Sequence, residues 1–194
     1  MVVASIFAKT NNQSLETISA VIQIGSNLLL VRERDSIVAI TESELSAARE
    51  AWGAGLVAIS KAYEAGGIDE ARPVAEGVLD AAYGYNLGPV LFKPTLASGD
   101  QTFRPTKKGA LSYFVGHDDE YPLDGGFGIK GWREMESVTS ASFIEGDVAM
   151  WMGWVILTDK DGNVTKVDKS FCYKKDAEGT LRIVQHHSSL PYQP

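Results

Sequence analysis

The sequence predicts an α+β fold, in which long N-terminal helices pack in a strongly curved antiparallel β-sheet. Two observations lead to this prediction. Apolar residues recur at helical spacing between Thr41 and Ala82, and four strand patterns joined by short glycine turns follow between Ser137 and Ser188. A meander of this kind can curl around the first helix, so we expect a cone with an interior cavity.

The composition is that of an ordinary globular protein, with 194 residues, 44% hydrophobic and 22% charged. The net charge is −7, and lysine pairs occur only at Lys107-Lys108 and Lys174-Lys175, so neither nucleic acid nor a membrane is expected as a partner. Cys172 is the only cysteine, which excludes an internal disulfide and any cysteine-based metal motif. The apolar start of the chain makes a poor signal peptide, so we expect a cytoplasmic protein.

The first part of the chain has the weakest pattern. Three apolar residues have helical spacing: Leu15, Ile18 and Ile22. Two short apolar runs, Leu28–Val31 and Ile37–Ile40, fit a helix or a strand equally well. We therefore interpret residues 1–40 as an N-terminal extension and residues 41–194 as one cone-fold domain.

The helix from Thr41 to Ala65 has the clearest signals. Thr41 and Glu44 form a capping box, in which each side chain satisfies a backbone N–H group at the helix start. Gly66-Gly67 ends the helix, and a second helix is expected from Asp69 to Ala82. The apolar stripe of the first helix consists of Leu45, Ala48, Trp52, Leu56, Ile59 and Tyr63.

Strand patterns follow Gly88. Two short strands are predicted at Val90–Thr95 and Ala110–Val115, and residues 116–134 are expected to form a long loop. The meander then comprises Ser137–Glu145, Val148–Thr158, Val164–Tyr173 and Thr180–Ser188. Within it, Ala149–Leu157 is apolar without alternation and needs a cover on both faces. We expect the first helix on one face and a second subunit on the other, in a homodimer.

The last strand ends in four polar residues. Side chains alternate along a strand, so His186 and Ser188 share one face, and His187 and Ser189 share the other. With Thr95 and Tyr113 on neighbouring strands, His186 and Ser188 form a neutral set that suits hydrogen bonding to a small polar ligand. Threonine and tyrosine also favour strands, so both residues equally fit ordinary structural positions.

A metal site is not favoured by the three histidines. His186 and His187 point to opposite faces of a strand, so both cannot easily bind one ion. His117 lies beside Asp118 and Asp119, and this cluster fits a solvated acidic loop better than a weak metal site. A serine triad is not favoured either, because the sequence contains no G-x-S-x-G motif.

Several ordered motifs of residues 41–194 resemble the iota-class carbonic anhydrases. The motifs are Phe92–Ala97, Gly109–Gly116, Gly126-Phe127 followed by Gly131-Trp132, Val167–Tyr173 and Leu181–Tyr192 with its His-His-Ser-Ser-Leu-Pro run. More distantly, the chain is similar to the nuclear transport factor 2-like cone fold. That superfamily includes ketosteroid isomerase and the association domain of the calcium/calmodulin-dependent kinase.

The resemblance implies a lyase that reversibly hydrates carbon dioxide to bicarbonate, in a homodimer with one pocket per cone. Members of the class are described with zinc or manganese, while a cyanobacterial and algal branch works without metal. By motif position, Thr95, Tyr113, His186 and Ser188 would bind the substrate, and the three hydroxyl residues would act in catalysis. The alternatives are a non-catalytic oligomerisation or ligand-binding module of the same fold, and an isomerase or dehydratase. An isomerase would need a carboxylate or a His–Asp pair inside the cone.

Overall fold

The computed structural model describes residues 4–5, 18–24, 27–32 and 39–193, and the chain divides into two units, Met1–Val38 and Ala39–Pro194. In the first unit, β1 (Ala4–Ser5), β2 (Ile18–Ile24) and β3 (Asn27–Arg32) form an antiparallel sheet. The helical spacing noted there was therefore misleading, because Ile18 and Ile22 also alternate with period two in β2. Leu15 and Ile37 lie outside the described residues. The predicted boundary after residue 40 stays a prediction.

The second unit begins with the two predicted helices, α1 (Glu42–Gly66) and α2 (Ile68–Ala82). Both bonds of the capping box are present: the Glu44 amide donates to Thr41 Oγ1 at 3.2 Å, and the Thr41 amide donates to Glu44 Oε2 at 2.8 Å. Gly67 separates the helices with φ of 72°, a conformation that glycine adopts without strain. Most of the predicted stripe is buried, including Leu45, Trp52, Leu56 and Ile59.

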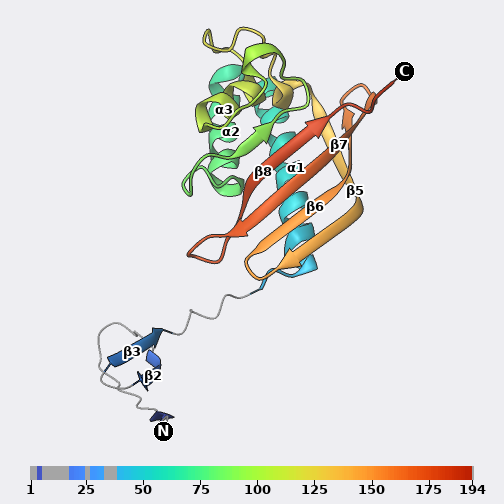
Figure 1. Ribbon diagram of the computed structural model, residues 1–194. Helices are drawn as coiled ribbons and strands as arrows, with labels where there is room; N and C mark the ends of the chain where they lie inside the picture. Colours follow the sequence, from blue (N-terminus) through green and yellow to red (C-terminus); the bar gives the residue numbers. More distant parts are fainter. Residues whose placement is uncertain (1–3, 6–17, 25–26, 33–38, 194) are drawn as a thin grey trace. The chain divides into compact units, whose positions relative to one another are not determined.

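The sheet follows the predicted meander. Its order is β4-β8-β7-β6-β5, and β5 to β8 pair antiparallel while β4 pairs parallel to β8. The strands are β4 (Leu91–Lys93), β5 (Trp132–Glu145), β6 (Val148–Asp159), β7 (Val164–Lys175) and β8 (Leu181–Ser189). The helix α1 lies across one face of this sheet (Figure 1), and the core forms between them. The α+β cone prediction is confirmed.

One predicted strand is wrong. Residues Lys107–Val115 form the helix α3, so Ala110–Val115 is helical. Thr106 caps this helix by accepting a hydrogen bond from the Gly109 amide at 3.2 Å, and Gly116 ends it with φ of 62°. A six-residue apolar run is too short for its periodicity to separate a buried helix from a strand.

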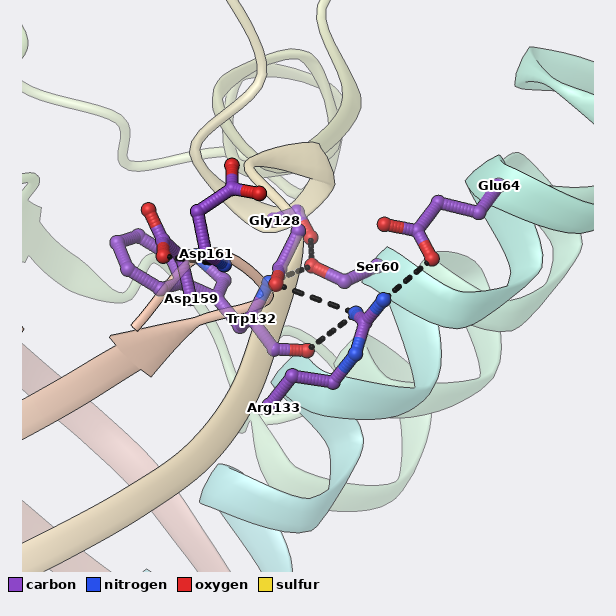
Figure 2. A network of polar contacts seen from close by, with 8 residues as sticks. Ser60, Glu64, Gly128, Trp132, Arg133, Asp159 and Asp161 are labelled. Carbon is purple, nitrogen blue, oxygen red and sulfur yellow. Dashed lines mark hydrogen bonds and ion pairs between the residues drawn. The ribbon is translucent and has the colours of Figure 1, made fainter. Parts of the chain in front are cut away.

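The segment expected to be one long loop is partly ordered. It contains the 3₁₀ turn η2 (Phe127–Ile129), and β5 begins at Trp132 rather than Ser137. Ser60 of α1 joins both: its hydroxyl donates to the Gly128 carbonyl at 2.6 Å and accepts from the Trp132 amide at 2.9 Å. Figure 2 shows this network, with Arg133 reaching Glu64 on the next turn of α1. The loop is thereby fixed to the long helix.

The face of the sheet opposite α1 carries exposed apolar side chains. Along β6, Ala149 and Trp151 are buried, while Met150 and Met152 are 51% and 53% exposed. The strand is therefore apolar on both faces, as its sequence predicts. Within the described ranges, no helix combines the length and the apolar character that crossing a membrane requires.

Candidate active site

The end of β8 has the predicted alternation. His186 and Ser188 are buried, His187 is exposed and Ser189 is half-buried. Pairing with β7 sets Phe171 opposite His186 and Lys169 opposite Ser188. Because directly opposed residues of antiparallel strands place their side chains on the same face, Lys169 and Ser188 are neighbours inside the cone.

Three hydroxyl groups meet at this position. Thr95, just beyond the end of β4, donates to Ser188 Oγ at 2.7 Å, and Ser188 donates to the Asp168 carbonyl at 3.0 Å. Tyr113 comes from α3, and its buried hydroxyl has no hydrogen-bond partner among the described residues. Burial raises the pKa of the Tyr113 phenol, and the nearby Thr95 hydroxyl partly opposes this effect. We call Thr95, Tyr113 and Ser188 the hydroxyl cluster.

Tyr113 reaches the hydroxyl cluster although it lies on a helix and not on the predicted strand. Its ring stacks on Phe127 with centroids 5.5 Å apart and meets Phe92 edge-on at 5.7 Å. These contacts hold the phenol in one orientation. Tyr113 therefore lies near Thr95 and Ser188 as the sequence predicted, but a helix carries its side chain instead of a strand.

Both ring nitrogens of His186 are engaged by other side chains. Nδ1 lies 2.9 Å from the Tyr83 hydroxyl, and Nε2 lies 2.8 Å from Lys169 Nζ. Phe92 and Phe171 pack on the imidazole with ring centroids 4.6 and 4.5 Å away. Burial, followed by the charges of Lys169 and His187, holds the pKa of His186 well below its ordinary value. The imidazole is therefore neutral at pH 7.

Sequence reasoning assigned no role at the site to Lys169, Tyr83 or Trp52, although it placed Trp52 in the apolar stripe of the first helix. Lys169 is 3% exposed, and its Nζ lies 4.8 Å from the centre of the Trp52 ring. The Trp52 indole N–H donates to the Tyr83 hydroxyl at 3.0 Å. The sequence did contain a signal for Lys169. It occupies every second position of β7 together with Val167, Phe171 and Tyr173, a series of inward-facing residues in which lysine is rare. Trp52 and Tyr83 carried no such signal.

A buried ion pair holds α3 beside the hydroxyl cluster. Arg104 Nη2 lies 2.8 Å from Asp124 Oδ1, and Ser112 of α3 donates to Asp124 Oδ2 at 2.8 Å. The backbone N–H of Arg104 also donates to the carbonyl of Phe92 at 2.8 Å. Because Ser112 precedes Tyr113, these bonds position the phenol. Asp124 lies within residues 116–134, which the sequence predicted as a long loop without a role for this carboxylate.

The predicted acidic loop does not form a metal centre. His117 Nδ1 lies 2.8 Å from the Val115 carbonyl. In the part of the chain that the structure describes, no group of three or more His, Cys, Asp or Glu residues is placed to hold an ion. Two cavities of about 300 and 310 Å³ lie elsewhere, and neither is lined by the hydroxyl cluster. The first runs along Phe92, Lys93 and His187, on the outer side of β8.

Comparison with known proteins identifies the family. A family model described as metal-independent carbonic anhydrase matches residues 43–190. A metal-independent carbonic anhydrase from Nostoc sp. strain PCC 7120 is 56% identical over 155 residues, which are 80% of this chain and 76% of the relative.

Solved structures agree with this assignment. A cyanobacterial iota-carbonic anhydrase in complex with bicarbonate is 56% identical, with a TM-score of 0.79 over 80% of this chain and 95% of that one. A chain assigned as a calcium/calmodulin-dependent protein kinase II association domain from Xanthomonas campestris is 20% identical, with a TM-score of 0.50 over 84% of this chain and 100% of that one. The second likeness concerns the fold alone. The chain belongs to the metal-independent carbonic anhydrase family and is therefore a lyase that catalyses the hydration of carbon dioxide to bicarbonate.

Proposed function

We propose that the hydroxyl cluster is the place where this enzyme hydrates carbon dioxide, with Thr95, Tyr113 and Ser188 as its catalytic residues. The convergence of three buried hydroxyls from three different elements carries this proposal. The match to a relative crystallised with bicarbonate supports it. The reaction needs water held next to carbon dioxide and a donor for the negative charge that develops on oxygen.

The donors and acceptors of the hydroxyl cluster suit these two tasks. The Thr95 hydroxyl donates its hydrogen bond to Ser188, and the Ser188 hydroxyl donates to the Asp168 carbonyl. Both oxygens therefore keep lone pairs that can accept a hydrogen bond from a water molecule. The Tyr113 hydroxyl keeps a free donor. Its raised pKa keeps the phenol protonated, so Tyr113 acts as a hydrogen-bond donor to the substrate oxygens and not as a base.

We assign His186 a narrower role in substrate binding than its sequence position suggested. Its neutral ring forms one wall beside the cluster, between Phe92 and Phe171. A direct hydrogen bond from His186 to bicarbonate requires that Tyr83 or Lys169 release a ring nitrogen. Substrate hydrogen bonding therefore falls first to Thr95, Tyr113 and Ser188.

Stopped-flow measurement of carbon dioxide hydration on chelator-treated protein tests the proposal. We expect Tyr113→Phe and Ser188→Ala each to lower kcat/KM by roughly 100-fold, because each removes one group that orients water or the developing oxyanion. Ser189→Ala is the matched control, since Ser189 lies on the other face of β8 and bonds Asp168 Oδ1 there. Undiminished activity in both cluster variants would remove the cluster from the mechanism.

We also propose that the enzyme is a homodimer formed through the outer face of the sheet. Support comes from four exposed apolar residues of neighbouring strands, Val138, Phe143, Met150 and Met152. Met152→Glu should then yield monomers in light scattering. Leu123→Glu, at an exposed apolar residue between α3 and η2, should leave the oligomeric state unchanged. A monomeric native protein would contradict the dimer.

A cytoplasmic location is proposed as well. It is supported by the single thiol, Cys172, which is free and half-buried. Fractionation of cells that express the full chain tests the location, and recovery in an extracellular or periplasmic fraction would contradict it.

A further inference from the structure

Hydration of carbon dioxide releases a proton, and the hydroxyl cluster has no group to take it. The pKa of Tyr113 is raised, and an unperturbed threonine or serine hydroxyl does not ionise near neutral pH. A base with a pKa near the working pH is the efficient acceptor. The acceptor must therefore be a buried side chain near the cluster with an available lone pair.

Lys169 is a buried amine that lies next to Ser188 in the strand register. It lies directly opposite Ser188 on β7, with its side chain on the same inner face of the sheet. Its Nζ lies 2.8 Å from Nε2 of His186, the inward-facing residue of β8 next to Ser188. The amine therefore borders the imidazole on the same inner face of the sheet that carries the Ser188 hydroxyl.

Burial disfavours a positive charge on Lys169. Among the described residues, no carboxylate forms an ion pair with it, and the Asp168 carboxylate is bonded to Ser189. The pKa of Lys169 is lowered to about 7, chiefly by burial; the charge of Lys93 adds to this lowering, and that of Asp168 opposes it. The groups that face Lys169 from the packed elements are Trp52 of α1, Phe171 of β7, His186 and Ser188 of β8, and Lys93 of β4.

His186 can bond Lys169 in either protonation state of the lysine. In one neutral tautomer, Tyr83 donates to Nδ1, and the Nε2–H group donates to the lone pair of the amine. In the other, Nδ1–H donates to the Tyr83 oxygen, which also accepts from Trp52, and Nε2 accepts from Lys169. The second tautomer leaves the amine lone pair free and equally suits the ammonium form. The same 2.8 Å contact is thus kept before and after protonation.

We propose that Lys169 is the proton acceptor of the hydration reaction, with His186 as the residue that positions it; this inference rests on the proposed function. The water oxygen forms a bond to carbon, and one O–H bond of the water breaks. The proton joins the lone pair of Lys169 Nζ, and one C=O electron pair moves onto oxygen, which yields bicarbonate. The ammonium group then loses its proton to a buffer base, and the amine is restored.

Kinetics of Lys169→Met and Lys169→Arg test this role. We expect kcat of the native enzyme to rise as the pH increases through about 7, because the amine forms there. Methionine should lower kcat by roughly 100-fold and remove this rise. Arginine should not restore it, because a guanidinium does not give up its proton. Lys174→Met is the matched control on β7, since Lys174 pairs with Asp147 at the surface and should change nothing.

A direct titration keeps the test decisive if a variant fails to fold. In native protein with ¹³Cε-labelled lysine, one resonance should titrate near pH 7, and the folded arginine or methionine variant should lack it. A Lys169 resonance that titrates at the ordinary lysine pKa of 10.5 would overturn the proposal. So would full activity of Lys169→Met with the native pH profile. An inactive native enzyme would instead contradict the proposed function, and the two failures are thereby distinguished.

Discussion

Two buried basic side chains lie near the hydroxyl cluster, and they differ in what balances their charge. Arg104 is 2% exposed and pairs with the Asp124 carboxylate at 2.8 Å. Lys169 is 3% exposed and faces an imidazole and aromatic rings. A buried charge needs a partner of opposite sign, and a lysine without one shifts its pKa instead. The first residue can therefore anchor structure, while the second can exchange a proton near neutral pH.

The comparison also separates two functions around the site. Through Asp124 and Ser112, the ion pair of Arg104 fixes α3 and with it the Tyr113 donor. Lys169 lies on β7, across from Ser188 and in contact with His186. Rigid positioning therefore comes from the helical side of the hydroxyl cluster, and the titrating group comes from the sheet.

The largest expected effect comes from breaking the ion pair of Arg104. In Asp124→Asn, a buried guanidinium loses its counter-charge, and we expect about 3–5 kcal/mol less stability in urea unfolding. Asp147→Asn removes the partly exposed partner of Lys174, at the surface, and should leave the unfolding midpoint unchanged. An equal response of the two variants would show that burial of the pair has no energetic consequence.

The next effect is the pH dependence that Lys169 imposes on stability. Its pKa is about 7 in the folded protein and 10.5 as the ordinary value, so between these values the unfolded chain binds more protons. The free energy of unfolding should therefore increase with pH in this window, by roughly 1.4 kcal/mol per pH unit. This contribution is lost as the pH decreases to about 7. Urea unfolding of the native protein and Lys169→Met at about pH 7 and about pH 9 measures the difference. A Lys169→Met profile parallel to the native one would contradict the assignment.

A smaller loss of stability is expected when the hydrogen bond from Tyr83 to His186, the residue that positions Lys169, is removed. Tyr83→Phe leaves two buried groups without a partner, the Trp52 indole N–H and His186 Nδ1, so we expect about 2 kcal/mol less stability. The matched control is Tyr85→Phe, whose half-buried hydroxyl makes one long bond of 3.3 Å to the Arg104 carbonyl. Thermal unfolding of both variants at one pH compares them. A larger loss in Tyr85→Phe would show that the Tyr83 bond is not the important one.

Local sequence patterns predicted the regular elements well. The capping box at Thr41 and the apolar stripe after it predicted α1, and glycine turns predicted the meander. The same local reasoning failed at Ala110–Val115, because a short buried run has no polar face from which its periodicity can be read. Tyr113 was selected for its motif position and reached the site from an unexpected element.

The sequence by itself determined which residues share a face of β8. Alternation puts His186 and Ser188 on one face and His187 on the other, because the side-chain period of a strand is two, and the structure shows that the first face is the inner one. The tertiary structure alone decided what His186 contacts. Tyr83 is 103 positions away from it and Lys169 is 17, and each contact depends on how helix and sheet pack. Burial lowers the pKa of Lys169, and burial is a property of the packed molecule, which no local pattern contains.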